Sequence, residues 1–381
     1  MKHKGIKFLK KEELTDSIAV VVGTRPGIIK FSPVIRALEK QKCNYFIAHT
    51  GQHYSYNMDK TFFEDLELPE PKYRIDVTKK AKLHGAQTAE MLKALEQAFL
   101  KEKPGVVIVG GDANTNLAGA LAARKLGIEV AHMEAGLRSD DWRMPEEHNR
   151  VMIDHISEYL FAPTEEAKEN LIRDNVKGKI FVVGNTIVDA VYQNIEIAKR
   201  KSQILNKLKL KKDEYFVLTL HREENVDDKE TLVNILKGIK QTAEKFKMPI
   251  IFPIHPRTKK RIKEFDLREK LKSIPYLKVI KPIGYLDFLL LLSNARLVLT
   301  DSGGIQEETC ILKVPCVTLR ESTERSETVK AGSNTVAGTK PEGIISGVKK
   351  MLKVERNWEN PFGDGKAGEK IVEKLLLEVY R

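Results

Sequence analysis

Residues 105–136 read GVVIVGGDANTNLAGALAARKLGIEVAHMEAG, and the order of elements in this stretch decides the fold. The segments GVVIVGGD and IEVAHMEAG at its two ends are short, apolar and rich in β-branched residues, which is typical of strands. The residues between them have a helical period. Strands that are apolar throughout belong to parallel sheets covered on both faces, so the stretch predicts a strand–helix–strand unit with parallel strands.

The same alternation continues along the chain in both directions. Further strand-like runs in the first half are SIAVVVG, NYFIAHTG, YLFAPT and KIFVVGN. After a helical, Lys-rich segment at 189–212 the alternation restarts with YFVLTLH, PIIFPIH, LKVIKP, ARLVLTD and VPCVTLR. The sequence therefore predicts an α/β protein with two doubly wound parallel sheets, the second beginning near Tyr215.

Length and composition agree with two packed domains. The chain has 381 residues, 41% hydrophobic and 31% charged, which argues against disordered, collagen-like and coiled-coil proteins. No apolar run reaches the roughly 18 residues of a membrane span, and the N-terminal segment lacks a hydrophobic signal region. We expect a cytoplasmic protein with no membrane partner. The three cysteines, Cys43, Cys310 and Cys316, form no CxxC pair, so we expect neither a disulfide nor a structural zinc.

The net charge leaves several classes of partner open. An excess of 65 Lys and Arg over 53 Asp and Glu gives +12, which suits nucleic acid, an acidic membrane or a phosphorylated small molecule. The basic residues are spread along the chain between acidic ones, and no aromatic residues alternate with them. This pattern favours solvated helix faces, and we predict no nucleic-acid partner.

Polar groups directly follow six of the predicted strands. They are Gly23–Arg25, Gly111–Asp112, Glu134–Gly136, His221–Glu223, His255–Arg257 and Asp301–Gly304. Ligands of open α/β sheets bind outside the carboxyl ends of the strands. If the two sheets face each other, these groups line one central cleft. Ordinary loops and helix caps are the alternative for each group taken alone.

The segment TDSGGIQEE, residues 300–308, connects a predicted strand to a helix. Backbone N–H groups of Ser302, Gly303 and Gly304 at the start of that helix would bind a diphosphate, helped by the helix dipole. Glu308, one turn further, would accept hydrogen bonds from the hydroxyls of a ribose. A plain helix cap with a glutamate three or four residues on is the alternative.

Two further glycine-containing segments differ in their context. GTRPGIIK, residues 23–30, also joins a strand to a helix but lacks the Gly-Lys-Ser/Thr ending of a P-loop. Its Arg25 and Lys30 would anchor a phosphate or a sugar hydroxyl, with plain surface charge as the alternative. The only GxGxxG, residues 363–368, follows ENPF rather than a strand, which argues against a dinucleotide site and an NAD enzyme.

Titratable groups for acid/base chemistry come from both halves of the chain. They are the carboxylates Asp112, Glu134, Glu146 and Glu147, together with His221. Asp112 and Glu134 follow successive strands, so we expect them to lie close enough to interact, with helix capping as the alternative. A first-turn helix position is the alternative for Glu146, which follows a proline. His221 ends a buried strand beside Arg222 and would bind phosphate.

Metal binding and covalent catalysis are disfavoured. His132, His148 and His155 lie in one region, but their spacing fits no HExxH or other zinc pattern. Neither a GxSxG elbow nor a Cys–His pair is present.

Taken in order along the chain, these and other motifs resemble the non-hydrolysing UDP-N-acetylglucosamine 2-epimerases. The segments that carry the resemblance are GTRPGIIKFSPVIRAL, TGQHY, GGDANTNLAGALAA, MEAGLRS with PEEHNR, FAPTEEAKENL, GNTIVDAV, LHREEN, DSGGIQEE, TERSETVKAG and NPFGDGKA. They extend from Val20 to about Ala367. A match of ten ordered segments is far more specific than any one of them.

The resemblance implies a glycosyltransferase-B type fold, with two Rossmann-like domains facing a central cleft. It divides the chain into an N-terminal domain at 1–190, a UDP-binding domain at 191–361 and a C-terminal helix at 362–381 that crosses back to the N-terminal domain. It also implies a homodimer.

The chemistry implied is reversible inversion at C2 of UDP-GlcNAc, giving UDP-ManNAc, without NAD, metal or other cofactor. No carbonyl makes the C2 proton acidic, so the family's route is anti-elimination of UDP to 2-acetamidoglucal followed by re-addition. Such a route needs carboxylates around the sugar ring and cationic or N–H groups on the departing diphosphate.

Site residues follow by matching positions. Asp112, Glu134 and Glu146 are the acid/base candidates, with their individual roles open, and His221 neutralises the leaving UDP. The implied substrate-binding residues are Arg25, Lys30, Phe288 near uracil, Ser302, Gly303, Gly304, Glu308 and Arg325. Gln52 and His53 match a second, activating UDP-GlcNAc site.

One departure and one alternative remain. The family usually reads GTRPE where this chain has GTRPG, so Gly27 removes a carboxylate that would support substrate or activator binding. A UDP-sugar-dependent glycosyltransferase of the same fold is the alternative function, and it would need a single base and an open acceptor groove.

Overall fold

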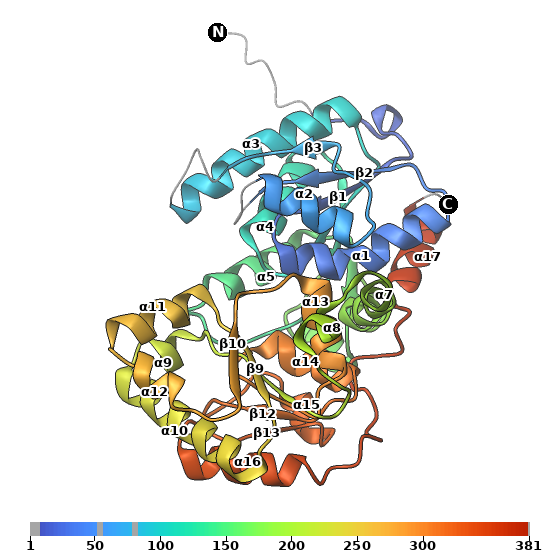
Figure 1. Ribbon diagram of the computed structural model, residues 1–381. Coiled ribbons are helices and arrows are strands. Elements are labelled where there is room, and N and C mark those ends of the chain that lie inside the picture. Colours follow the sequence, from blue (N-terminus) through green and yellow to red (C-terminus); the bar gives the residue numbers. More distant parts are fainter. Residues whose placement is uncertain (1–7, 52–55, 78–82, 380–381) are drawn as a thin grey trace. The chain divides into compact units, whose positions relative to one another are not determined.

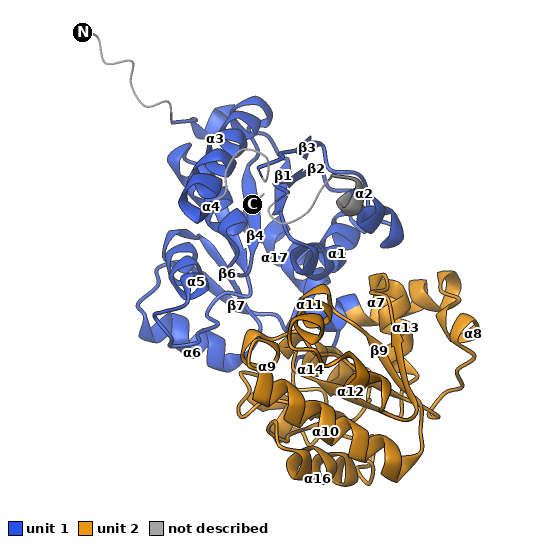
Figure 2. Ribbon diagram, turned by 60° about the vertical axis from the view of Figure 1, so that its left-hand side comes forward, with its two compact units in different colours: residues 1–190, 362–381 blue, residues 191–361 orange. Residues whose placement is uncertain are grey.

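The computed structural model describes residues 8–51, 56–77 and 83–379 (Figure 1). The chain divides into two compact units, which Figure 2 shows in different colours. The first unit comprises residues 1–190 together with 362–381, and the second comprises 191–361.

Within the described residues, the first unit forms a seven-stranded sheet. Its strands are β1 (Ile18–Val22), β2 (Tyr45–His49), β3 (Tyr73–Arg74), β4 (Val106–Gly110), β5 (Glu129–Met133), β6 (Tyr159–Ala162) and β7 (Lys179–Val182). The order across the sheet is β3-β2-β1-β4-β5-β6-β7, and all neighbours pair in parallel. This order reverses direction between β1 and β4, as in doubly wound dinucleotide-binding folds.

Helices cover both faces of this sheet. They are α1 (Arg25–Lys40), α2 (Tyr56–Asp65), α3 (His84–Glu102), α4 (Asn114–Lys125), α5 (Pro145–Ile156), α6 (Glu165–Arg173), the start of α7 (Thr186–Lys201) and α17 (Ala367–Val379), with a 3-10 turn η1 (Lys11–Glu13). Ala19 and Val21 of β1 pack against α3 and α4 in one apolar cluster. Alternate residues of a strand face opposite sides, so Ile18 and Val20 face the other side, where α1 contacts β1 and β4.

The C-terminal helix α17 belongs to the first unit and packs against α1. The GxGxxG segment leads into it, and its last glycine, Gly368, lies so close to α1 that a Cβ there would be 2.8 Å from Cβ of Pro33. The backbone N–H of Gly368 donates to Asp189 at 2.8 Å. Gly368 therefore serves close helix packing, which gives a physical reason for this glycine outside a nucleotide site.

The second unit repeats the architecture. Its strands are β8 (Phe216–Leu218), β9 (Ile250–Pro253), β10 (Leu277–Ile280), β11 (Leu297–Thr300), β12 (Cys316–Thr318) and β13 (Asn334–Val336). They form a parallel six-stranded sheet in the order β10-β9-β8-β11-β12-β13. The reversal here lies between β8 and β11.

Helices again lie on both faces of this second sheet. They are the remainder of α7, α8 (Ile204–Leu208), α9 (Glu223–Val226), α10 (Lys229–Phe246), α11 (Pro256–Glu264), α12 (Arg268–Lys272), α13 (Tyr285–Ser293), α14 (Gly303–Ile311), α15 (Ser326–Lys330) and α16 (Pro341–Met351). Phe216 and Leu218 of β8 join the apolar cluster of α10 and α16. Their neighbours Tyr215 and Val217 join the cluster of α8 and α13 on the opposite face.

The predicted fold class is confirmed, because each unit is a doubly wound parallel sheet. Every strand-like run identified in the sequence contains an observed strand. Two short edge strands, β3 and β13, escaped prediction because Tyr73–Arg74 and Asn334–Val336 are too short and too polar to form an apolar run. Among the described residues, no helix is long and apolar enough to cross a membrane.

Candidate active site

Most of the predicted phosphate and acid/base residues that the structure describes lie at or just after the carboxyl ends of strands beside the reversal point of each sheet, where ligands of such sheets bind. In the first unit they follow β1, β4 and β5, and in the second they follow β8 and β11. Each unit presents its own set of groups.

Glu134 directly follows β5 and has a backbone φ of +62°, in the left-handed region. A residue with a side chain pays roughly 1–2 kcal/mol for this conformation, so its surroundings must hold it. Lys30 of α1 supplies one such restraint, because its Nζ lies 2.7 and 2.8 Å from the two carboxylate oxygens. Gly111 lies beside the same carboxylate, since a Cβ there would be only 3.1 Å from Oε2 of Glu134. The structure therefore brings Lys30, Gly111 and Glu134 together.

Asp112, the residue after Gly111, is oriented by helix α5. Its carboxylate pairs with Arg150, and its backbone carbonyl accepts a hydrogen bond of 2.8 Å from Asn149. The side chain of Asp112 remains 40% exposed, so it is positioned but accessible. Arg150 and Asn149 were not identified from the sequence. They lie about one strand–helix unit away from Asp112 along the chain, so only the fold brings them into contact with it.

Glu146 and Glu147 are neighbours in the first turn of α5 and have different surroundings. Glu147 is buried, accepts hydrogen bonds from the backbone N–H and hydroxyl of Ser139 at 3.0 and 2.8 Å, and pairs with Arg150 at 2.6 Å. Burial opposes its ionisation, but the hydrogen bonds from Ser139 and the charge of Arg150 outweigh this and lower its pKa. Glu147 therefore has a structural role, whereas Glu146 is exposed and can meet a ligand.

The turn between β1 and α1 is tightly packed. A Cβ on Gly23 would lie 2.1 Å from Oγ1 of Thr115 and 2.2 Å from Oγ1 of Thr50, so only glycine fits. Thr24 caps α1 by accepting a hydrogen bond of 3.2 Å from the backbone N–H of Gly27. Arg25 begins the helix, with its guanidinium 5.7 Å from the ring centre of Phe62.

The geometry of this cap gives a physical meaning to Gly27. It occupies the third helical position, where a glutamate after a threonine N-cap completes a capping box. The carboxylate missing from GTRPG would thus fulfil a helix-capping role, besides any role in binding.

In the second unit, His221 is held by Asp301. The fully buried Asp301 accepts hydrogen bonds from the backbone N–H groups of His221 and Arg222 at 2.8 and 2.9 Å, and its other oxygen lies 3.0 Å from Nδ1 of His221. Burial favours the neutral acid, but the hydrogen bond and charge of His221 outweigh it, so the pKa of Asp301 is lowered. This contact directs Nδ1 inward and leaves Nε2 for a ligand. Asp301 was quoted in a sequence motif but not singled out, because only the fold reveals its link to His221.

Helix α14 begins with the residues predicted to bind phosphate. Ser302 is its N-cap residue but makes no side-chain capping hydrogen bond, which disfavours the plain-cap alternative. A Cβ on Gly304 would find no atom within 4 Å, so the space beside this glycine is open to a ligand. A Cβ on Gly303 would instead meet Glu324 at 2.8 Å. The helix start thus presents N–H groups beside open space, as an anion site requires.

Three further predicted residues come from the segment that runs from α13 to α15, and each has a different environment. They are Phe288, Glu308 and Arg325. Burial raises the pKa of Glu308 to about 8, and the charge of Glu307 adds to this, against a hydrogen bond from Tyr285. Nε of Arg325 lies 2.7 Å from Glu307. Phe288 packs partly into the apolar cluster on one face of the second sheet. Near neutral pH the Glu308 carboxyl is therefore protonated and can both donate and accept hydrogen bonds.

Two other predictions concern an activating site and metal binding. Gln52 and His53, matched to an activating site, lie outside the described residues. In the part of the chain that the structure describes, no group of three or more His, Cys, Asp or Glu side chains is arranged to hold a metal ion. His132 instead contacts Asp154 at 2.7 Å, and His148 contacts the carbonyl of Trp142 at 2.8 Å.

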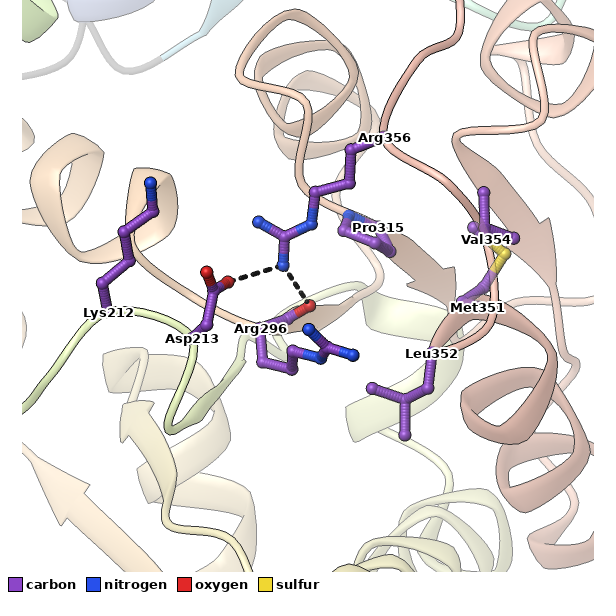
Figure 3. Close-up of a pocket in the computed structure, with 8 residues that line it drawn as sticks. All are labelled: Lys212, Asp213, Arg296, Pro315, Met351, Leu352, Val354 and Arg356. Atoms are coloured by element: carbon purple, nitrogen blue, oxygen red, sulfur yellow. Dashed lines mark hydrogen bonds and ion pairs between the residues drawn. The ribbon is translucent and has the colours of Figure 1, made fainter.

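A pocket of about 390 Å³ in the second unit lies at the opposite, amino-terminal edge of its sheet (Figure 3). Asp213, Arg296 and Pro315, which line it, come shortly before β8, β11 and β12. Figure 3 shows Arg356 reaching Asp213 and the carbonyl of Arg296, at 2.7 and 3.0 Å. The helices of a parallel α/β sheet have their C-terminal ends at this edge, where cationic side chains interact favourably with the negative ends of the helix dipoles. The pocket is therefore separate from the candidate site.

Comparison with known proteins identifies close relatives over almost the whole chain. The sequence profile of the family described as UDP-N-acetylglucosamine 2-epimerase matches residues 36–376. The UDP-N-acetylglucosamine 2-epimerase of Methanocaldococcus jannaschii is 58% identical over 367 residues, which cover 95% of this chain and 100% of that protein.

Solved structures support the same family. The crystal structure of the Methanocaldococcus jannaschii UDP-GlcNAc 2-epimerase in complex with UDP-GlcNAc and UDP has a TM-score of 0.83 and 58% identity, covering 95% of this chain and 99% of that chain. A glycosyltransferase from Streptomyces nogalater covers 95% of both chains with a TM-score of 0.52 but only 12% identity, so that likeness concerns the fold alone.

Proposed function

The chain belongs to the UDP-N-acetylglucosamine 2-epimerase family, as its ordered motifs predicted, and from this premise we propose that it interconverts UDP-GlcNAc and UDP-ManNAc by inverting C2. The observation that carries this assignment to particular residues is the Glu134 carboxylate, which pairs with Lys30 beside the loop of Asp112 and belongs to a residue with a left-handed backbone conformation. Strain of this kind concentrates at functional sites.

The proposed chemistry is elimination followed by re-addition. A carboxylate removes the C2 proton while the C1–O bond breaks and its electron pair leaves with UDP, giving 2-acetamidoglucal. UDP then adds back to C1 while a proton is delivered to the opposite face of C2. Asp112, Glu134 and Glu146 of the first unit are the acid/base candidates, and Arg25 and Lys30 bind the substrate there. The route is redox-neutral and requires no cofactor.

The second unit is proposed to bind the UDP part. His221, oriented by Asp301, would neutralise the departing diphosphate, and the N–H groups of Ser302, Gly303 and Gly304 would stabilise its negative charge. Glu308 would bind the ribose, Phe288 would lie near uracil, and Arg325 would contact UDP. This division assigns residues 1–190 and 362–381 to the sugar chemistry and 191–361 to nucleotide binding.

The glycosyltransferase alternative is disfavoured. The relatives matched over the full length are epimerases, and the glycosyltransferase likeness concerns only the fold. Product analysis by proton NMR tests the proposal: incubation with UDP-GlcNAc should produce the anomeric signal of UDP-ManNAc. Free ManNAc together with UDP would instead indicate a hydrolysing enzyme, and an unchanged spectrum would contradict epimerisation.

We propose two further properties, namely a homodimeric state, which the family resemblance implies, and a cytoplasmic location, as expected from the sequence. Sedimentation equilibrium of the purified protein tests the first, and cell fractionation tests the second. A monomer at micromolar concentration or recovery with membranes would contradict them.

A further inference from the structure

A group of ionisable side chains is buried in the first unit, beginning on β5, the strand that leads to Glu134. The side chains of His132 and Asp154 are completely buried and that of Arg138 is 4% exposed. Nδ1 of His132 lies 2.7 Å from Oδ1 of Asp154, and Nη1 of Arg138 lies 2.7 Å from Oδ2 of the same residue. Removing such ions from water costs several kcal/mol each, so well-packed apolar residues would serve stability as well. The group therefore calls for another explanation.

The two ring nitrogens of His132 contact two different partners. Nδ1 faces the carboxylate of Asp154, and Nε2 faces the backbone carbonyl of Gly111 at 3.2 Å. Both partners are hydrogen-bond acceptors. The ring of His132 therefore links the carboxylate of Asp154 to the backbone of Gly111.

The His132–Asp154 pair contacts the backbone of two loops, the one that follows β4 and the one that follows β5 and contains Glu134. His132 holds the carbonyl of Gly111, which precedes Asp112 and lies against the Glu134 carboxylate. Asp154 accepts a hydrogen bond of 3.2 Å from the backbone N–H of Gly136, two residues after Glu134. The pair thus fixes both loops relative to each other.

Helix α5 connects this pair to the other acid/base candidates. Asp154 lies near its end, Arg150 and Asn149 hold Asp112 from its middle, and Glu146 lies in its first turn. Movement of α5 relative to β5 would therefore disturb all three candidate carboxylates.

We propose that His132 and Asp154 are a positioning pair that fixes the Glu134 and Asp112 loops in their reactive arrangement, an inference that rests on the proposed epimerase function. The pair has no contact with substrate in this account and acts through the backbone of Gly111 and Gly136. Misplacement of reacting groups by about 1 Å is enough to lower a rate about 100-fold.

The test compares the same substitution at two buried aspartates of the first unit. Asp154→Asn removes the negative charge and leaves one acceptor oxygen where His132 and Gly136 use two, while Asp189→Asn weakens the contact with Gly368 at the start of α17, away from the site. We expect Asp154→Asn to lower kcat at least about tenfold with KM within about twofold of the wild type. Asp189→Asn should leave kcat within about twofold, although both variants lower the Tm. Equal kcat in the two variants, or a normal kcat in Asp154→Asn, would overturn the proposal.

A second readout is independent of catalysis. In ¹⁵N-histidine-labelled protein, the ring signals that disappear in His132→Gln identify His132, and they should show a hydrogen-bonded Nδ1. Asp154→Asn should shift these signals, whereas Asp189→Asn should leave them unchanged. His132 ring signals that are the same in the wild type and in Asp154→Asn would overturn the inference. Failure of the wild type to convert UDP-GlcNAc would instead contradict the proposed function, since the ring signals do not require conversion.

Discussion

The two units share a strand order but present different chemistry at the same edge. In the first, the carboxyl ends of β4 and β5 carry Asp112 and Glu134, whose carboxylates pair with Arg150 and Lys30. In the second, the corresponding edge carries His221 and the N-terminus of α14, and its carboxylate Asp301 is buried behind the histidine. The fold decides where functional groups gather, whereas the residues after each strand decide whether they exchange protons or bind an anion.

The largest effect on kcat is expected from a substitution at Glu134, an acid/base candidate of the first unit. Glu134→Gln removes the ionisable group and its pairing with Lys30, so kcat should fall at least about 100-fold, the scale of one acid/base group. UDP affinity, measured by calorimetry, should stay within about twofold, because the second unit binds UDP. Glu158→Gln is a control in the same unit, since Glu158 binds the backbone N–H of Val130 near the start of β5. Near-normal turnover in Glu134→Gln would remove Glu134 from the mechanism.

The matching change in the second unit is His221→Ala. Loss of the group that neutralises the departing diphosphate should lower kcat about 100-fold and also weaken UDP binding, unlike the change in the first unit. His255, whose ring centre lies 5.4 Å from that of His221, provides the control variant His255→Ala. Unchanged UDP affinity in His221→Ala would contradict the division of roles between the units.

A smaller effect is expected from filling the space beside the phosphate loop. Gly304→Ala introduces a methyl group that meets no protein atom, so any loss reports on ligand approach. We expect UDP affinity to fall about tenfold, since backbone N–H groups must approach the diphosphate closely. Gly85→Ala, at the same position of α3 and equally open, should leave UDP affinity unchanged. Equal affinities in both variants would argue against diphosphate at this helix start.

The smallest effect concerns the pH dependence of stability. The pKa of Glu308 is raised to about 8 from an ordinary value of 4.5, so the folded protein binds a proton that the unfolded chain releases. This contribution is complete below pH 4.5 and is lost as the pH rises toward 8. Glu308→Gln, which stays neutral, should lose less stability over this range, with a difference in Tm of at least about 2 °C. Parallel Tm profiles for the two proteins would contradict the burial of this carboxyl.

Most of the fold was predictable from local sequence, because each buried parallel strand is a continuous apolar run. The short edge strands β3 and β13 were not, since pairing rather than composition defines them. For the site, position after a strand was enough to predict Asp112, Glu134 and His221 as candidates. The contacts that orient them were not predictable. Arg150 lies 38 residues from Asp112, and Asp301 lies 80 from His221, so only the folded sheets bring them together.

The central claim is that the C2–H bond breaks during the reaction, and the isotope content of C2 tests it most directly. The wild-type protein would be incubated with UDP-GlcNAc in D2O, without added NAD or metal, and both nucleotide sugars analysed by NMR and mass spectrometry. The account predicts one deuterium at C2 of UDP-ManNAc and of the recovered UDP-GlcNAc, and almost none with Glu134→Gln. UDP-ManNAc that retains hydrogen at C2 would contradict it.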